Sequence, residues 1–169
     1  MARVLIIEGG DRGLRLAERL HREDHAVRIT TAGEERREAI QRAGAECWVG
    51  DPDRLATLRG ALENVTIVCW LLGAADATEE RLAALHSSRL EFFLGQVIDS
   101  TVRGFVYEAA GMVGDGAVPA DVLAGGERIV RRIAERSEIP IRFLRADPGE
   151  ADLWLEDARA AIDALLLGR

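Results

Sequence analysis

The chain has 169 residues, of which 48% are hydrophobic and 30% charged, and its formal net charge is −7. This length and composition are typical of one globular domain rather than of a disordered or fibrous chain. The negative charge argues against nucleic acid and anionic membranes as partners. All 22 basic residues are Arg, so chemistry that needs a lysine, such as a Schiff base or a Tyr/Lys proton relay, is excluded.

Cysteine and histidine usage gives no sign of a disulfide framework or a metal centre. Cys47 and Cys69 stand in no metal-ligand spacing, so we expect free, buried thiols. The three histidines share no ligand spacing with a carboxylate, and surface or packing roles are expected for them. The first apolar run is too short for a secretory signal, and the apolar stretch 65–75 is too short to span a bilayer. We therefore expect a cytoplasmic protein without a metal.

Short apolar runs alternate with longer amphipathic segments along the whole chain. Strands are expected at 4–7, 27–31, 46–49, 65–72, 104–107 and 139–144. Helices are expected at 14–22, 34–43, 53–62, 78–101, 119–136 and 153–167. This alternation predicts an α/β fold, with a parallel sheet covered by helices on both faces. The glycine-rich segment 111–116 is expected to be a mobile loop.

The helix expected at 53–62 depends on its starting residues. Asp51 is a typical N-cap, and Pro52 is typical of the first turn of a helix. Segment 78–101 carries an apolar stripe at helical spacing over its whole length, so we expect one continuous helix there.

A glycine-rich loop joins the first expected strand to the first expected helix, and residues 8–16 read EGGDRGLRL. Glycines at such a turn let the backbone approach a pyrophosphate, and the helix N-terminus supplies free N–H groups. A strand before the loop, a helix after it and a βαβ pattern beyond it form the context that dinucleotide binding requires.

Together these segments resemble the atypical short-chain dehydrogenase/reductases, close to the nitrogen-metabolite-regulator-like and NAD-dependent epimerase-like NAD(P)H-binding Rossmann proteins. Gly10 and Gly13 match the first two glycines of the family's GxxGxxG, and residues 44–62, 105–107 and 139–145 resemble its later strands and their flanks. The resemblance covers nearly the whole chain and implies that residues 1–169 form a single NAD(P)-binding Rossmann domain, without the usual C-terminal substrate lobe. It implies a three-layer, doubly wound α/β fold with six parallel strands in the order 3-2-1-4-5-6.

The resemblance also implies a nucleotide site at the switch between the first and fourth strands. Gly10 and Gly13 would line the pyrophosphate, Asp51 would lie near the adenine, and Leu72 and Gly73 would lie beside the nicotinamide-side ribose. The complete set of predicted cofactor-binding residues is Gly10, Arg12, Gly13, Leu14, Thr31, Arg36, Asp51, Leu72 and Gly73.

Charge near the adenosine ribose bears on the choice between NADP and NAD. NAD-binding proteins usually end the second strand in an acid, whereas residues 30–33 here read TTAG. Arg12, Arg36 and Arg37 would favour a 2′-phosphate through charge-assisted hydrogen bonds. We therefore expect NADP, with NAD as the alternative. A solvated helix face explains Arg36 and Arg37 equally well.

Three features depart from the family pattern. Leu16 replaces the third glycine and is expected to push the first helix outward. Glu8 and Asp11 bring negative charge to a diphosphate site. The Tyr/Lys pair and strand-end Ser of the dehydrogenases are missing, since the single Tyr, Tyr107, lies within a strand. Glu108 follows it, and we expect a solvated carboxylate there, with an acid–base role as the alternative.

Two functions therefore remain open. The first is an NAD(P)H-dependent oxidoreductase acting on an unidentified small molecule, with the cofactor carrying the hydride chemistry. The second is a non-catalytic dinucleotide-sensing or protein-interaction domain. No catalytic residue can be assigned. In the resembled family the helices corresponding to 78–101 and 119–136 often pair across a dimer, so we also expect a homodimer there, unless their apolar stripes only cover the sheet.

Overall fold

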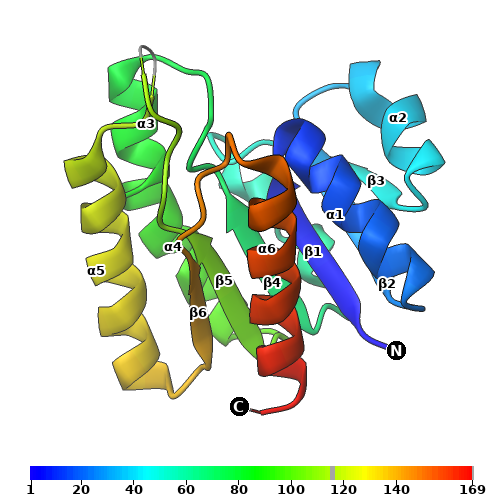
Figure 1. Cartoon of the computed structure of the whole chain (residues 1–169). Coiled ribbons are helices and arrows are strands. Elements are labelled where there is room, and N and C mark those ends of the chain that lie inside the picture. Colours follow the sequence, from blue (N-terminus) through cyan, green and yellow to red (C-terminus); the bar gives the residue numbers. More distant parts are fainter. Residues whose placement is uncertain (115–116, 169) are drawn as a thin grey trace.

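The computed structural model describes residues 1–114 and 117–168. Six parallel strands form one sheet in the order β3-β2-β1-β4-β5-β6, so the predicted α/β class and strand order are confirmed (Figure 1). The strands are β1 (Arg3–Glu8), β2 (Ala26–Thr31), β3 (Glu46–Val49), β4 (Ile67–Leu71), β5 (Gly104–Glu108) and β6 (Ile141–Leu144). The loop predicted at 111–116 includes residues 115–116, which lie outside the described residues.

Helices cover both faces of the sheet. They are α1 (Gly10–Arg22), α2 (Arg37–Arg42), α3 (Glu79–Leu85), α4 (Ser88–Ile98), α5 (Ala120–Ser137) and α6 (Ala151–Leu166), with short 3-10 turns η1 (Glu34–Arg36), η2 (Leu55–Thr57) and η3 (Gly60–Leu62). Helices α1, α2 and α6 pack on one face, and α3, α4 and α5 on the other. No helix in the described part of the chain is long and apolar enough to cross a membrane.

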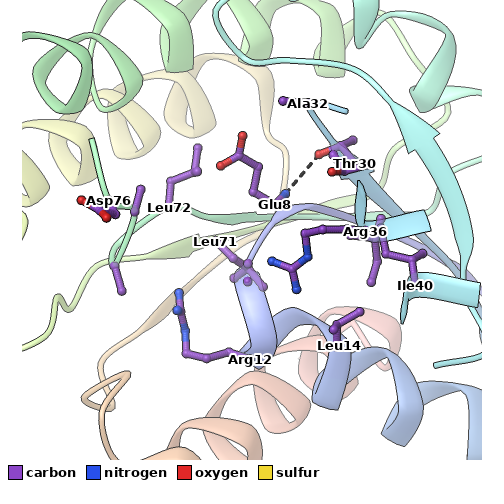
Figure 2. A pocket seen from close by; sticks show the side chains of 16 residues that line it. Glu8, Arg12, Leu14, Thr30, Ala32, Arg36, Ile40, Leu71, Leu72 and Asp76 are labelled. Atoms are coloured by element: carbon purple, nitrogen blue, oxygen red, sulfur yellow. Dashed lines mark hydrogen bonds between the residues drawn. The ribbon is translucent and has the colours of Figure 1, made fainter. Parts of the chain in front are cut away.

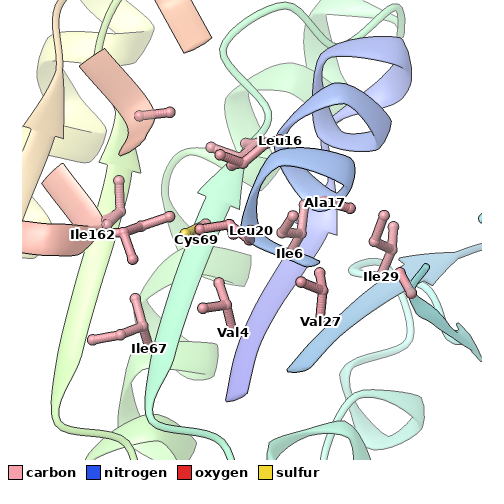
Figure 3. Packing of buried hydrophobic residues seen from close by; sticks show 14 of the residues in the cluster. Val4, Ile6, Leu16, Ala17, Leu20, Val27, Ile29, Ile67, Cys69 and Ile162 are labelled. Carbon is pink, nitrogen blue, oxygen red and sulfur yellow. The ribbon is translucent and has the colours of Figure 1, made fainter. Parts of the chain in front are cut away.

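Strand residues divide between the two faces by alternation, as the strand period requires. Val4 and Ile6 of β1 face the α1 and α6 side, which Figure 3 shows, whereas Leu5 and Ile7 face the α4 side. All of β4 is buried, as expected for a central strand covered on both faces. The two cores fix the strands in register, so the carboxyl ends of β1, β2, β4 and β5 lie at one edge.

The helix predicted at 53–62 is wrong, because this segment forms only the turns η2 and η3. The Thr57 hydroxyl accepts from the Asp51 backbone N–H at 2.8 Å, and the Thr57 carbonyl accepts from the Trp48 indole at 2.8 Å. The Asp51 carboxylate accepts from the Asp53 N–H at 2.9 Å, which forms a local turn instead of a helix cap. These side-chain contacts compete for the backbone groups that a helix would use.

The continuous helix predicted at 78–101 is also wrong, because it divides into α3 and α4 around His86 and Ser87. The His86 ring is buried, and its nitrogens contact the Tyr107 hydroxyl at 2.7 Å and the Leu72 carbonyl at 3.0 Å. Burial lowers the pKa of His86 to about 4, although the Leu72 contact opposes this, so the imidazole is neutral at pH 7. The break turns this side chain toward the sheet, where it has the packing role expected of it.

Helix α5 is tied to the end of β6 through Glu127. Its carboxylate accepts two hydrogen bonds of 2.7 Å from Arg145, which follows β6, and one of 2.8 Å from Arg131. These bonds, those from Arg145 above all, lower the pKa of Glu127 to about 2. The ionised form is therefore the one that stabilises the fold.

Glu127→Gln should lower the stability of the fold at pH 7, and the stability of the variant should change less than that of the wild type as the pH falls. The carboxylate contributes fully above its ordinary pKa of 4.5 and loses that contribution as the pH falls toward 2. Thermal melts of both proteins between pH 7 and pH ~2.5 test this. We expect the difference in Tm to shrink as the pH falls, and a difference that stays constant would contradict the role of this ion pair.

Candidate functional site

The β1–α1 loop makes a tight turn at the carboxyl edge of the sheet. Glu8, Gly9 and Gly10 all have positive φ, of 59°, 79° and 56°. Glycine adopts this conformation freely, whereas Glu8 adopts it at a cost of roughly 1 kcal/mol. Helix α1 begins at Gly10, earlier than the predicted residue 14. Because the first amides of a helix have no partner within it, the loop presents free N–H groups.

The closest approach of α1 to β1 is at Gly13. A Cβ atom built there would lie 2.9 Å from the Glu8 carbonyl oxygen, so only glycine fits. Leu16 is fully buried in the core between α1 and the sheet. The expectation that Leu16 pushes α1 outward is therefore wrong, because the helix faces the strand through Gly13 and Leu16 fills the space one turn later.

A cavity of about 380 Å³ opens beside this loop, between the carboxyl ends of β1, β2 and β4 (Figure 2). This is the point where the strand order reverses, at which open α/β sheets bind ligands. Six predicted site residues line the cavity: Gly10, Arg12, Leu14, Thr31, Arg36 and Leu72. Gly13, Asp51 and Gly73 are not part of its lining.

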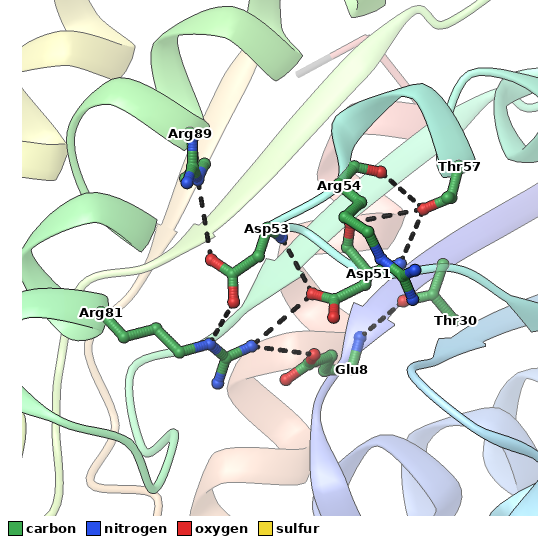
Figure 4. Close-up of polar contacts among 8 residues, drawn as sticks. All are labelled: Glu8, Thr30, Asp51, Asp53, Arg54, Thr57, Arg81 and Arg89. Carbon is green, nitrogen blue, oxygen red and sulfur yellow. Dashed lines mark hydrogen bonds and ion pairs between the residues drawn. The ribbon is translucent and has the colours of Figure 1, made fainter.

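Asp51 belongs instead to an ion-pair cluster around Arg81, which sequence analysis did not single out (Figure 4). The Arg81 guanidinium lies 3.8 Å from both Glu8 and Asp51, and it bonds Asp53 at 2.5 Å. Burial raises the pKa of Glu8, and the neighbouring Arg81 opposes that shift. The cluster therefore offsets negative charge at the rim of the cavity and ties α3 to the segment after β3.

Arg36 and Arg37 have different surroundings. Arg36 lines the cavity on its β2 side and lies 3.3 Å from the fully exposed Asp11 carboxylate. Arg37 pairs with Glu34 three residues earlier and is not part of the lining. The two interpretations weighed for these arginines therefore apply to different residues. Arg36 lines the cavity, whereas Arg37 lies on a solvated helix face.

Glu108 is fully buried, so the solvated carboxylate expected there is wrong. Its oxygens accept from the Arg12 guanidinium at 2.7 and 3.0 Å, from the Gly73 amide at 2.7 Å and from the Trp154 indole at 2.7 Å. Burial raises the pKa of Glu108, and Arg12 opposes that shift most strongly. Arg12 therefore points toward β5 and away from the end of β2. Among the residues that the structure describes, its buried Nε–H has no hydrogen-bond partner.

The Glu108 contacts explain why Gly73 is glycine. A Cβ atom there would lie 2.6 Å from the Ala110 carbonyl oxygen and 2.8 Å from the Glu108 carboxylate. Trp154 gave no signal in the sequence, because it reads as an ordinary apolar position of the last helix. Only the packing of α6 against β5 reveals its indole as a donor.

Tyr107 points to the opposite face of the sheet from Glu108. It is fully buried among the α4 and α5 side chains, and its hydroxyl contacts His86 at 2.7 Å and the Leu123 carbonyl at 3.3 Å. Burial raises the pKa of Tyr107. The single tyrosine therefore cannot deliver a proton to the cavity.

Neither a protein-family model nor a curated protein matches this chain. Several solved structures share its fold. A short-chain dehydrogenase/reductase superfamily protein from Agrobacterium tumefaciens with bound NAD is 20% identical, with a TM-score of 0.66 over 85% of this chain and 48% of that one. UDP-glucuronic acid 4-epimerase from Bacillus cereus in complex with NAD is 16% identical, with a TM-score of 0.63 over 86% and 56%.

Vestitone reductase from alfalfa (Medicago sativa) is 16% identical, with a TM-score of 0.61 over 85% of this chain and 56% of that one. The chain thus spans about half the length of these structures. The predicted resemblance to short-chain dehydrogenase/reductase and epimerase structures is confirmed at the level of the fold, which is a doubly wound Rossmann-type α/β fold.

Gly13→Ala should destabilise the protein by about 1–3 kcal/mol, because the added Cβ meets backbone that cannot move aside cheaply. Gly95→Ala in α4 is the matched control. A Cβ there meets nothing within 4 Å, so the change should raise stability by up to about 1 kcal/mol through helix propensity. Urea denaturation of both variants measures the difference, and equal effects would contradict the close approach at Gly13.

Proposed function

We propose that this chain binds a nicotinamide dinucleotide, with a preference for NADP over NAD, in the cavity beside the β1–α1 loop. The observation that carries the proposal is the position of this cavity, at the reversal of strand order and against the glycine turn. Three of the solved structures with this fold contain NAD, which supports the same class of ligand.

The residues around the cavity fit an anionic nucleotide. The first amides of α1 offer donors to a diphosphate. Thr31 and Arg36 lie on the β2 side, where a ribose and its 2′-phosphate are expected. Glu8 opposes the diphosphate, and Arg81 beside it reduces that effect.

The proposed activity is recognition of the dinucleotide rather than turnover. The chain contains no lysine, and its one tyrosine is buried on the far face of the sheet. Glu108, the carboxylate at the end of β5, is saturated by three donors from the protein itself. These features favour the dinucleotide-sensing alternative over an oxidoreductase that acts on a small molecule. Steady-state NADPH oxidation with quinone, flavin and aldehyde panels would detect the oxidoreductase.

Arg36→Ala should weaken NADPH binding by roughly 10- to 100-fold and leave NADH binding unchanged, because a charge-assisted contact to the 2′-phosphate is worth about 1.5–3 kcal/mol. Isothermal titration with both cofactors measures this. Arg37→Ala is the control, because the guanidinium of Arg37 pairs with Glu34 outside the cavity. Equal losses for NADPH and NADH in Arg36→Ala would overturn the assignment of NADP specificity to this residue.

The homodimer through helices 78–101 and 119–136, and the cytoplasmic location, stay predictions. The apolar side chains of α4 and α5 pack mainly against the sheet. A dimer would have to use the outward faces, where Phe92 is exposed and where Glu91 of α4 pairs with Arg132 of α5. Light scattering at micromolar concentration tests the dimer, and a monomeric mass would contradict it.

A further inference from the structure

The cavity is not evenly shared between the two halves of the sheet. A doubly wound fold consists of two mononucleotide-binding halves, here β1–β3 and β4–β6. The lining comes from the β1–α1 loop, the end of β2, Arg36 and Ile40 of the following helical segment, the end of β4 and residues 74–76 after it. Within the described residues, no part of β5, β6 or α6 contributes to it. The open space therefore extends over the first half, which takes the adenosine side of a dinucleotide, and reaches only the β4 end of the second half.

The second half is closed by contacts within the protein. The Glu108 carboxylate stands at the carboxyl end of β5, and it binds Arg12 from α1, the Gly73 amide after β4 and the Trp154 indole from α6. Glu108 has no exposed surface and Trp154 has 1%. The Arg12 guanidinium also lies 5.2 Å from the centre of the Trp154 ring.

These contacts resist opening. A buried carboxylate that loses its partners is left as an unpaired charge in an apolar environment, which is strongly unfavourable. A nicotinamide ribose entering between β4 and β5 would have to displace Arg12 and separate Glu108 from its donors. The first half requires no such change, since its cavity already exists beside the free amides of α1.

We propose that this site recognises the adenosine half of its ligand, a 2′-phosphorylated adenosine 5′-diphosphate, and that the nicotinamide ring makes no contribution to affinity. This inference rests on the proposed nucleotide function and narrows it. The α1 amides bind the diphosphate and Arg36 binds the 2′-phosphate, while the Arg12–Glu108–Trp154 contact keeps the nicotinamide ring outside. Such a site senses adenosine nucleotides without positioning a hydride donor.

The test compares NADPH with 2′-phospho-ADP-ribose, which lacks only the nicotinamide, and with reduced nicotinamide mononucleotide, which lacks the adenosine half. In isothermal titrations of the wild-type protein, we expect the first two Kd values to agree within about threefold and the mononucleotide not to bind. NADPH binding more than about threefold tighter than 2′-phospho-ADP-ribose would overturn the inference and leave the proposed function standing. Absence of binding by all three would overturn both.

Saturation-transfer NMR on bound NADP gives a second, atom-resolved reading of the same proposal. Saturation of the protein should reach the adenine protons strongly and the nicotinamide protons weakly. Comparable transfer to both rings would contradict a closed second half, whatever the affinities.

Arg12→Ala tests whether Arg12 excludes the nicotinamide ring. The measured quantity is the ratio of the Kd for NADPH to the Kd for 2′-phospho-ADP-ribose. Any loss of diphosphate binding affects both Kd values equally and does not change their ratio. Removing this guanidinium should let the nicotinamide contribute, so NADPH should gain at least threefold over 2′-phospho-ADP-ribose. Arg15→Ala is the control, because Arg15 lies on the same helix and pairs with the exposed Asp152. An unchanged ratio in Arg12→Ala would contradict the role of Arg12 in excluding the ring.

Discussion

The buried carboxylate of Glu108 is the constraint on which the carboxyl edge of this sheet depends. A buried carboxylate is tolerated only when its oxygens are hydrogen-bonded, and Glu108 obtains its donors from three separate segments. Arg12 comes from the first turn of α1, Gly73 from the residues after β4, and Trp154 from the first turn of α6. The carboxylate therefore fixes the relative positions of all three segments against β5, and Gly73 must be glycine because the carboxylate lies so close.

The same contact separates the ligand edge into an open and a closed part. On the β2 side, the glycine turn and Thr31 leave a cavity with Arg36 at its wall. On the β5 side, the groups that face a second nucleotide half in a doubly wound fold bind one another instead. The negative charge of Glu8 is also offset within the protein. Glu8 has a left-handed backbone conformation and lines the cavity, and the Arg81 guanidinium lies near its carboxylate. Charge at this edge is thus balanced within the protein before any ligand arrives.

A shared fold does not carry a shared activity when the reacting groups differ. This chain covers between 48% and 56% of the length of the similar solved structures, and identity to them does not exceed 21%. What this chain retains is the part of the fold that places helix amides and a glycine turn at the switch point. What it lacks is a lysine and an accessible tyrosine. Recognition of a nucleotide is consistent with both observations, because binding requires the helix amides and the glycine turn but neither a lysine nor a tyrosine.

The sequence by itself determined the fold class, because alternating apolar runs and amphipathic segments are local patterns that burial on two helix layers requires. Strand β3 forms at its predicted residues 46–49, and Arg36 was singled out from its place after β2. Only the tertiary structure decided that His86 breaks a long helix, that Asp51 joins the Arg81 cluster and that Glu108 is buried. The reason is distance along the chain: Arg12 and Glu108 are 96 residues apart, and Trp154 is another 46 residues on, so no local pattern contains the donors that bind this buried carboxylate.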